Sequence, residues 1–335
     1  MTTIELPTIE KPETTPPVAA DGCDNRLRVT GVDGVQHDIS DWTYGELLGF
    51  QCEQEPLFAR AIEETEKGSD ARCEITQLAY TTICTVLEQM TARFPAEAAL
   101  SQEGTFSMGM DPRYSDLILR LLAQQQSAGV EGGLFEVGFS AGVLLQQVAA
   151  AGYSVGGLEV VEELRQQAKA KLDPKHHSQL LVGDFCKLDL SEHVGRYSVV
   201  YWNDVFEHVP TDEIVDYVKV IHSLLAPGGK LVTITPNWHM RPSDVTDVFK
   251  PPRSEAVGFH LKEYTAREVC SVVREAGFSA VETPTFISRK RIYLSGIPGL
   301  TGLKNALEPL LEWLPYRVAV QCCRRFGLNC TVATK

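Results

Sequence analysis

Residues 134–142, LFEVGFSAG, decide the fold of this chain. A short apolar run contains an acid, Glu136, near its end, and two glycines, Gly138 and Gly142, follow four residues apart. A buried strand that stops abruptly and reverses needs residues without a Cβ, so that backbone N–H groups can face a ligand. The stretch therefore predicts a strand, a tight turn and a helix, with a ligand site at the turn. An ordinary strand-to-helix turn is the alternative.

The residue types in this turn indicate which ligand it suits. A dinucleotide site holds pyrophosphate with the pattern G-x-G-x-x-G, and the spacing here differs from that pattern. An acid at a strand tip, such as Glu136, accepts a hydrogen bond from a cationic amine. We therefore expect an adenosyl cofactor that carries an amine.

Two more acids end the next two predicted strands. The segment SVGGLEV, residues 154–160, places Glu159 at its carboxyl end, where a carboxylate can bind both hydroxyls of a ribose. The segment QLLVGDF, residues 179–185, ends in Asp184 and Phe185, which suit the amino group and the ring face of adenine. Ligands of open α/β sheets bind outside the carboxyl ends of the strands. The three strand ends thus predict one common site.

Strands and helices continue to alternate along the chain. Residues 197–204, YSVVYWND, and 230–237, KLVTITPN, predict a fourth and a fifth strand, the latter after a turn at 226–229, APGG. The final strand is expected within residues 328–334. This alternation predicts an α/β fold with a doubly wound, seven-stranded, mostly parallel sheet.

At this point the sequence resembles the class I S-adenosylmethionine-dependent methyltransferases, over residues 132–280 and again at the final strand. The resemblance implies S-adenosyl-L-methionine as cofactor. The resemblance assigns the ribose contact to Glu159 and the adenine contacts to Asp184 with Phe185. It assigns the first cofactor motif to Glu136, Gly138, Ser140 and Gly142. Ser140 departs from the family, which usually has glycine there, and serine has less freedom than glycine at positive φ.

The chain divides into three predicted parts. Residues 1–25, rich in Pro, Thr and Glu, are predicted to be disordered. Residues 26–127 are expected to form a hairpin around Asp33 and Gly34 and then helices over 43–93 and 113–126, which cover a substrate pocket. Residues 128–335 hold the cofactor-binding domain.

An insertion at about 289–326 interrupts the cofactor-binding domain before its last strand. It is predicted to form two short helices broken at Pro315. We expect its apolar faces to pack on the core or the pocket. Pairing of two subunits and contact with a membrane surface are the alternatives.

Composition restricts the class of protein. The chain has 335 residues and a formal net charge of −13, which disfavours a nucleic-acid partner because phosphate contacts need a basic surface. Nine cysteines without a C-x-x-C pair indicate neither a disulfide framework nor a zinc ribbon. The sequence presents no recognisable secretory leader or membrane-spanning run. We expect a cytoplasmic enzyme that acts on a small molecule, while its oligomeric state stays open.

The loop after the fourth strand, NDVFEHVP at 203–210, is expected to supply the chemistry. If the chain turns helically there, Asp204, Glu207 and His208 share one face. His260 lies shortly before a capping box that begins at Thr265, at the same edge of the sheet. Two carboxylates and two imidazoles suit Mg²⁺, Mn²⁺ or another divalent ion.

This arrangement resembles the ubiquinone-biosynthesis O-methyltransferases and the plant-type small-RNA 2′-O-methyltransferases, which share acid-x-x-Glu-His and a later His. The resemblance implies four metal ligands, Asp204, Glu207, His208 and His260. The family usually has Glu at the position of Asp204. The resemblance also implies that Asn203 contacts the methionine part of the cofactor. Residues 110–113, MDPR, resemble an Asn-Pro-x-Arg stretch one residue out of register, which makes Arg113 a candidate for the cofactor carboxylate.

These features together predict an O-methyltransferase that acts on a phenol, a catechol or a related hydroxylated metabolite, with Glu207 and His208 as its catalytic residues. Three roles stay open for this pair: metal binding, general-base catalysis by His208 without a metal, and purely structural use. Methylation of an RNA 2′-hydroxyl, N- or C-methylation, and a non-catalytic cofactor-binding module are the alternative functions.

Overall fold

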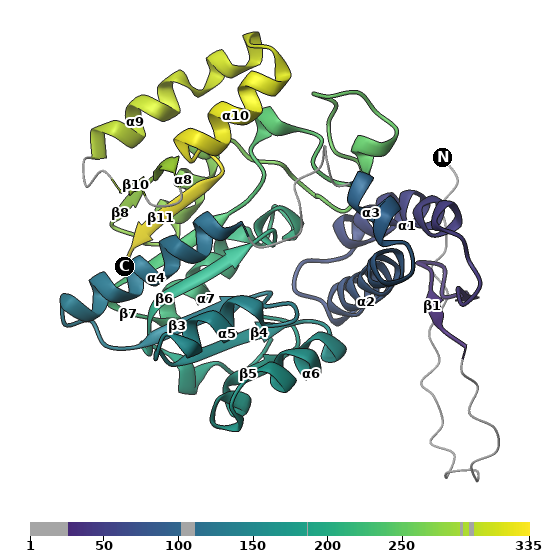
Figure 1. Ribbon diagram of the computed structural model, residues 1–335, viewed down its shortest axis with the longest axis horizontal. Coiled ribbons are helices and arrows are strands. Elements are labelled where there is room, and N and C mark those ends of the chain that lie inside the picture. The colour runs from purple at the N-terminus through teal and green to yellow at the C-terminus, as the bar shows by residue number, and fades with distance from the viewer. Residues whose placement is uncertain (1–25, 102–110, 186, 289–290, 295–297) are drawn as a thin grey trace.

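The computed structural model describes residues 26–101, 111–185, 187–288, 291–294 and 298–335 (Figure 1). The tail predicted to be disordered, residues 1–25, lies outside the described residues.

A seven-stranded sheet forms the centre of the molecule (Figure 1). In spatial order its strands are β5 (Leu180–Val182), β4 (Val155–Glu159), β3 (Gly133–Val137), β6 (Tyr197–Asn203), β7 (Leu225–Ile234), β11 (Cys330–Thr334) and β8 (Ala280–Glu282). The strands from β5 to β7 pair in parallel, and β11 is antiparallel to both of its neighbours. The chain reverses its direction of winding between β3 and β6, and this switch point is where such sheets bind ligands. The predicted fold class is confirmed.

Helices cover both faces of this sheet. On one face pack α4 (Pro112–Ser127), α5 (Val143–Ala150) and α6 (Glu162–Lys171), and on the other pack α7 (Ile214–Leu224) and α8 (Ala266–Glu275). Neighbouring residues of β3 show the alternation, since Leu134 belongs to the core on the α4 side and Phe135 to the core on the α7 side. A strand covered on both faces is mostly apolar, as β3 and β6 are. Although α4 falls in the region predicted to cover a pocket, its apolar face packs on the sheet.

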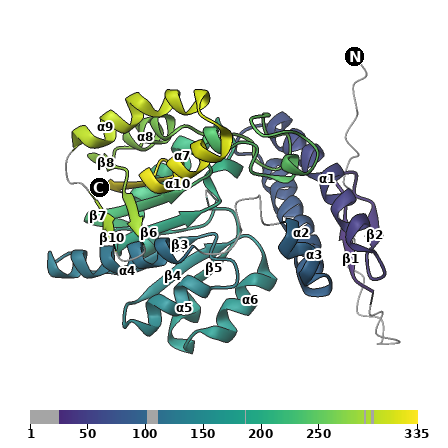
Figure 2. The same cartoon turned by 45° about the horizontal axis from the view of Figure 1, so that its top comes forward.

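The N-terminal region has a small core of its own. The predicted hairpin is confirmed as β1 (Arg28–Thr30) and β2 (Gln36–Asp38), and the predicted helices form α1 (Tyr44–Glu64) and α2 (Asp70–Arg93), followed by α3 (Pro95–Ser101). A capping box between Thr43 and Glu46 starts α1. Figure 2 shows α1 and α2 standing beside the sheet domain.

The start of β7 differs from the prediction. The strand begins at Leu225 rather than after the APGG sequence. Its pairing with β6 passes from Leu225 opposite Tyr197 to Lys230 opposite Val199, so residues 226–229 form an irregularity inside the strand. Gly228, with a φ of 77°, supplies the left-handed residue that this irregularity needs.

The insertion before β11 contains more structure than predicted. Its helices are α9 (Pro298–Leu307) and α10 (Tyr316–Phe326), and the predicted break at Pro315 is confirmed. A 3₁₀ segment, η6 (Glu308–Trp313), joins them, and an unpredicted hairpin of β9 (Thr285–Ser288) and β10 (Arg291–Tyr293) precedes them. Within the described ranges, no helix combines the length and the apolar character that crossing a bilayer requires.

A buried acid, Glu55 of α1, joins the N-terminal region to the sheet domain. Its Oε2 accepts a hydrogen bond from the backbone N–H of Phe259 at 3.0 Å, and its Oε1 accepts one from Gln51 Nε2 at 2.6 Å. Burial raises the pKa of Glu55 to about 7, and the nearby charge of Asp244 adds to the increase. The folded protein therefore binds a proton here more tightly than the unfolded chain does.

This difference predicts a pH-dependent stability. The pKa of Glu55 in the folded protein lies above the ordinary value of 4.5, so its contribution to the free energy of unfolding is complete below pH 4.5. As the pH rises toward 7, the free energy of unfolding falls by about 3 kcal/mol. Glu55→Gln should remove this loss, which urea unfolding at about pH 5 and about pH 8 would measure. Glu53→Gln, at an exposed position of the same helix, is the control. A Glu55→Gln variant with the wild-type pH dependence would contradict the assignment.

Candidate functional site

The carboxyl ends of β3, β4, β5 and β6 border a cavity of about 290 Å³. Five of the predicted site residues line it: Gly138, Glu159, Asp184, Phe185 and His208. Helix α2 forms the opposite wall with Arg72, Cys73, Thr76, Gln77 and Tyr80. The cavity therefore lies at the switch point, between the sheet domain and the N-terminal helices.

The glycine loop after β3 has the backbone that the sequence predicts. Gly138 and Gly142 have φ values of 71° and 73°, in the left-handed region. A Cβ at Gly142 would lie 2.6 Å from the Cβ of Ala168 in α6, so the loop needs glycine there for space as well. Ser140 also has a positive φ, 49°, which costs energy for a residue with a side chain. Its N–H donates to Glu159 Oε2 at 2.7 Å, and this hydrogen bond holds the loop in place.

The buried carboxylate of Glu159 organises this part of the cavity. Besides the Ser140 N–H it accepts hydrogen bonds from the N–H groups of Val160 and Val161 at 2.8 and 3.3 Å. Burial raises the pKa of Glu159, and these three hydrogen bonds oppose the rise. Since a carboxylate has about four acceptor positions, a further position remains for a ligand hydroxyl.

Asp184 and Phe185 follow β5 on the cavity wall. The Phe185 ring is buried and lies 5.8 Å from the ring of Tyr217 in α7. The Tyr217 hydroxyl lies 3.5 Å from Asp184 Oδ1. An aromatic face and an acceptor thus stand side by side at the position predicted for adenine.

Glu136 and Asn203, at the ends of the adjacent strands β3 and β6, carry unsatisfied buried acceptors. Glu136 Oε2 and Asn203 Oδ1 have no hydrogen-bond partner among the described residues. Burial and the charge of Glu159 raise the pKa of Glu136 well above its ordinary value. Asn203 Nδ2 donates to Asp204 Oδ2 at 2.7 Å. Neither Glu136 nor Asn203 lines the 290 Å³ cavity itself. Buried acceptors of this kind normally have donors, which a bound ligand would supply.

Arg113 lies away from the cavity. In α4 its guanidinium donates to Asp111 Oδ2 at 2.5 and 2.8 Å and to the Arg324 carbonyl at 3.3 Å. It also lies over the Phe286 ring, 5.3 Å from the centroid. The structure therefore does not bring Arg113 to the other predicted cofactor residues, because the acid two residues earlier engages its side chain.

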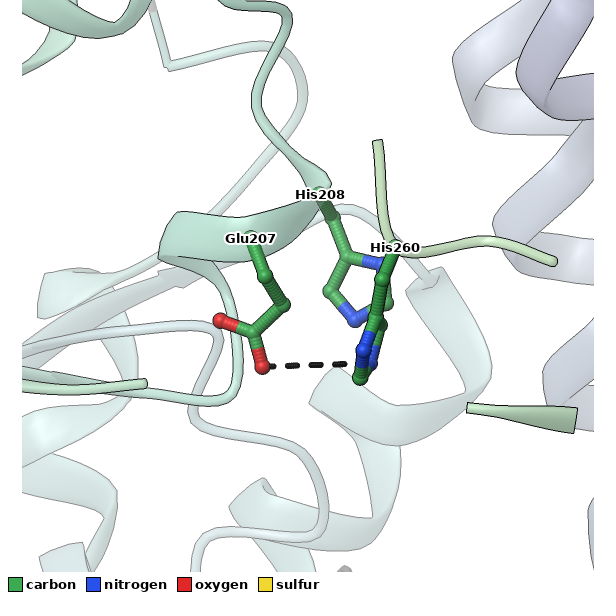
Figure 3. A group of neighbouring side chains, drawn as sticks. All are labelled: Glu207, His208 and His260. Atoms are coloured by element: carbon green, nitrogen blue, oxygen red, sulfur yellow. Dashed lines mark ion pairs between the residues drawn. The ribbon is translucent and has the colours of Figure 1, made fainter. Parts of the chain in front are cut away.

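Three side chains that the sequence predicts as metal ligands meet at the edge of the cavity, which His208 lines (Figure 3). Glu207 and His208 lie on η3 (Phe206–His208), and His260 lies on the loop before α8. One potential ligand atom from each lies within 4.8 Å of the other two. Glu207 Oε1, 3.9 Å from His260 Nε2, has no hydrogen-bond partner in the described part of the chain, while Oε2 accepts one from the Thr235 hydroxyl at 3.0 Å.

Hydrogen-bond partners outside the cluster orient both imidazoles. His208 Nδ1 lies 2.7 Å from the Phe259 carbonyl oxygen, which can only accept, so Nδ1 carries the proton and Nε2 retains a lone pair. His260 Nδ1 lies 3.3 Å from the Ser243 hydroxyl and 3.5 Å from Glu263 Oε1. Hydrogen bonds of this type to the second nitrogen fix the rings of metal-binding histidines.

The structure separates Asp204 from this group. Asp204 has φ 52° and precedes the 3₁₀ turn, so the predicted continuous helical face through Asp204, Glu207 and His208 does not form. Its Oδ2 accepts from Asn203, its Oδ1 has no hydrogen-bond partner among the described residues, and it is not one of the three residues whose ligand atoms gather. Burial, and then the charge of Glu207, raise its pKa well above the ordinary value.

Burial sets the protonation of the three clustered groups. It raises the pKa of Glu207 to about 7 against the opposing charge of His260. It lowers the pKa of His208 to about 3, with a further contribution from the charge of His260. Burial also disfavours the charged form of His260, but the hydrogen bond to Glu263 and the charges of Glu207 and Asp244 prevail and raise its pKa to about 9. A bound cation would therefore displace the proton of His260.

A second, more open hollow of about 480 Å³ borders the cluster at His260. Trp238 of η4 (Trp238–Met240) and the loop residues His260, Lys262 and Glu263 line it, together with residues near the start of α8. His208 borders the cavity and His260 borders this hollow. The cavity and the hollow thus each reach a different histidine of the cluster.

Comparison with known proteins agrees with the fold. Residues 108–283, just over half of the chain, match a family model described as a methyltransferase domain. The chain belongs to this methyltransferase family. As the sequence predicted, it is a class I S-adenosylmethionine-dependent methyltransferase.

Individual relatives of this methyltransferase are distant. The ubiquinone biosynthesis O-methyltransferase of Escherichia fergusonii is 32% identical over 111 residues, which are 32% of this chain and 45% of the relative. The match thus spans less than half the length of this curated relative. A methyltransferase of Thermotoga maritima, described as a possible histamine N-methyltransferase, is 14% identical with a TM-score of 0.40, covering 74% of this chain and 99% of its own. Phosphoethanolamine N-methyltransferase 2 of Haemonchus contortus is 14% identical with a TM-score of 0.42, covering 74% and 60%.

Sequence reasoning missed the residues of α2 that complete this methyltransferase site. The Tyr80 ring lies 5.9 Å from His208 and 5.0 Å from Phe259, in edge-to-face contacts. No motif marks Tyr80, because its role comes from a contact between segments distant in sequence. Glu263 and Thr235 were missed for the same reason, since each acts through a neighbour of the predicted residues.

Ion pairs hold the α1–α2 turn of the methyltransferase over its cavity. Arg72, which is buried, donates to Asp212 at 2.8 Å and to Glu213 at 3.0 Å. Lys187 pairs with Asp70 at 2.7 Å from the other side. Arg72 and Lys187 both line the cavity, so the same contacts close it and hold its two walls together.

Loss of this closure should weaken cofactor binding. We expect Arg72→Met to raise the Kd for S-adenosylmethionine roughly tenfold, or about 1.4 kcal/mol, because the turn no longer stays closed over the ligand. Isothermal titration calorimetry would measure it. Arg165→Met, which removes a more superficial ion pair within α6, should leave the Kd unchanged. Equal affinities of the Arg72→Met and wild-type proteins would show that the turn does not cover the cofactor.

Proposed function

We propose that this methyltransferase transfers a methyl group to a hydroxyl of a small phenol- or catechol-like molecule, with the help of a divalent cation held by Glu207, His208 and His260. The observation that carries the proposal is the position of this buried group, between the cavity at the switch point and the hollow beside His260. The short similarity to ubiquinone biosynthesis O-methyltransferases supports the choice of oxygen as acceptor.

The three residues fit a cation by their chemistry. Glu207 offers a buried carboxylate oxygen without a hydrogen-bond partner among the described residues, and His208 offers a lone pair on Nε2. Two imidazoles and one carboxylate suit Mn²⁺ and other first-row ions, and Mg²⁺ where water completes the shell. Such an ion favours the deprotonated form of a bound hydroxyl. Asp204 is left out of the proposed ligands because it is not one of the three residues whose ligand atoms gather.

The remaining chemistry needs alignment rather than a covalent nucleophile. The acceptor oxygen attacks the sulfonium methyl in line, the new C–O bond forms as the C–S bond breaks, and the electron pair stays on sulfur in S-adenosylhomocysteine. The hydroxyl proton goes to solvent. The chain holds both reactants close together and excludes water through α2, which is the main contribution available to an enzyme with an activated donor.

The cofactor contacts follow from the cavity. We assign the ribose to Glu159 and the adenine to Asp184 and Phe185, which line it. Glu136 and Asn203, with unsatisfied acceptors at neighbouring strand ends, are assigned to the amine of the methionine part. Arg113 is not assigned a contact.

General-base catalysis by His208 without a cation is the second candidate role. It needs an imidazole that gains a proton near neutral pH. Burial holds the pKa of His208 near 3, which makes this ring a weak base and leaves it in the neutral form that binds metal ions.

Methyl transfer from labelled S-adenosylmethionine to a panel of catechols and phenols tests the proposal. Transfer should disappear when a chelator removes divalent ions and return when Mn²⁺ or Mg²⁺ is added. His208→Ala should lower kcat at least about 100-fold, because a ligand is lost, while the Kd for S-adenosylmethionine stays within about twofold. His222→Ala, far from the cluster on α7, is the control.

Other results would contradict the proposal in distinct ways. Full activity in chelator together with the loss in His208→Ala would favour the metal-free base. Full activity of His208→Ala would remove the whole cluster from the reaction. Label found on amines rather than on hydroxyls would replace the acceptor class.

A further inference from the structure

The insertion carries a concentration of exposed apolar side chains. Among the described residues, eight of the seventeen large apolar side chains that are exposed lie in the segment 298–326, which we call the outer helical segment. They are Leu300, Leu303, Leu307, Leu310, Trp313, Leu314, Val318 and Phe326. Trp313, 87% exposed, stands out farthest. Figure 1 shows α9 and α10 on the outside of the molecule, away from the N-terminal helices.

These side chains are not the ones that fix the segment to the protein. Its inner face packs on the core through Leu311, Ala319 and Cys323, as the sequence predicted for part of this insertion. The segment is therefore apolar on two sides, and only one of them is covered. An amphipathic surface helix has a polar outer face, so an apolar outer face indicates contact with something further.

Charge identifies the partner. The outer helical segment contains four basic residues, Lys304, Arg317, Arg324 and Arg325, and two acidic ones, a net charge of +2 in a chain whose total is −13. Both acids are engaged: Glu308 is buried and accepts from Asn237, while the half-buried Glu312 pairs with Arg241 at 2.8 Å. On α10, Arg317 and Arg325 are exposed beside the apolar group. The outer surface thus combines apolar and basic side chains, while the rest of the chain is acidic.

We infer that the outer helical segment docks the protein onto an anionic lipid surface. Apolar side chains enter the boundary between headgroups and acyl chains, and adjacent arginines attract the anionic headgroups. The anionic surface repels the acidic remainder of the chain, and this repulsion orients the molecule with the outer helical segment toward the lipid. A twofold contact between two copies fits less well, because the same patch would meet itself and bring the arginines together.

The docked face is connected to the loop that carries His260. Glu312 of the segment pairs with Arg241, and its Oε2 lies 3.0 Å from His239 Nδ1. Arg241 and His239 both lie at the start of that loop. Trp238, which lines the open hollow, stacks with Arg241 at 3.9 Å. Docking therefore brings this hollow near the lipid surface. The inference itself does not depend on the proposed reaction.

Sedimentation of the full-length protein with vesicles tests the inference. We expect binding to vesicles of equal parts phosphatidylcholine and phosphatidylglycerol, weaker binding to phosphatidylcholine alone, and a decrease with added salt. The double variant Arg317→Glu with Arg325→Glu should bind at least about 30-fold more weakly, and Trp313→Ala roughly tenfold more weakly.

Matched controls separate the patch from general effects. Lys175→Glu with Arg196→Glu makes the same change in net charge at exposed positions elsewhere, and Val194→Ala removes another exposed apolar side chain. Both controls should bind like the wild type. Unchanged near-ultraviolet circular dichroism would show that each variant folds.

The inference is overturned if the wild type binds neither kind of vesicle, or if the patch variants and the controls bind equally. It is also overturned if sedimentation velocity shows a dimer that Trp313→Ala dissociates while no vesicle binding occurs. That last result would assign the apolar face to a second copy of the chain.

Discussion

The peptide groups of Phe259 hold the two halves of the molecule together at the site. Its N–H donates to Glu55 of α1, and its carbonyl accepts from the His208 imidazole. The N-terminal helices that cover the cavity are thereby fixed to the ring that belongs to the proposed cation site. The position of His260, the next residue along the chain, depends on the same backbone. Movement of α1 would therefore disturb the cover of the cavity and the cluster together.

Buried charge is the second constraint on this site. Four buried acids, Glu55, Glu207, Asp244 and Glu263, influence His260, which is the cationic group among them. Buried carboxylates are unfavourable unless they are paired, hydrogen-bonded or bound to a metal ion. The imidazolium of His260 compensates the negative charge of these four acids only in part, and a divalent cation beside Glu207 would compensate more of it. Electrostatics and ligand geometry thus favour the same occupant.

Much of the fold and part of the site could be predicted from local sequence. Strand ends, glycines at positive φ and caps depend on neighbouring residues, so Gly138, Gly142 and the helix at Thr265 are where the sequence places them. Asp204 could not be placed in this way, because its left-handed backbone interrupts the periodicity that the prediction assumed. The cavity wall of α2 and the outer contact of Glu263 arise from tertiary packing, for which one sequence carries no local signal.

A crystal structure with Mn²⁺ and S-adenosylhomocysteine, with an anomalous difference map, tests the central claim most directly. The account predicts one anomalous peak within coordination distance of Glu207 Oε1, His208 Nε2 and His260, with the adenosyl group in the cavity beside Glu159. A map without a peak at this position, with His260 still paired with Glu207, would contradict it.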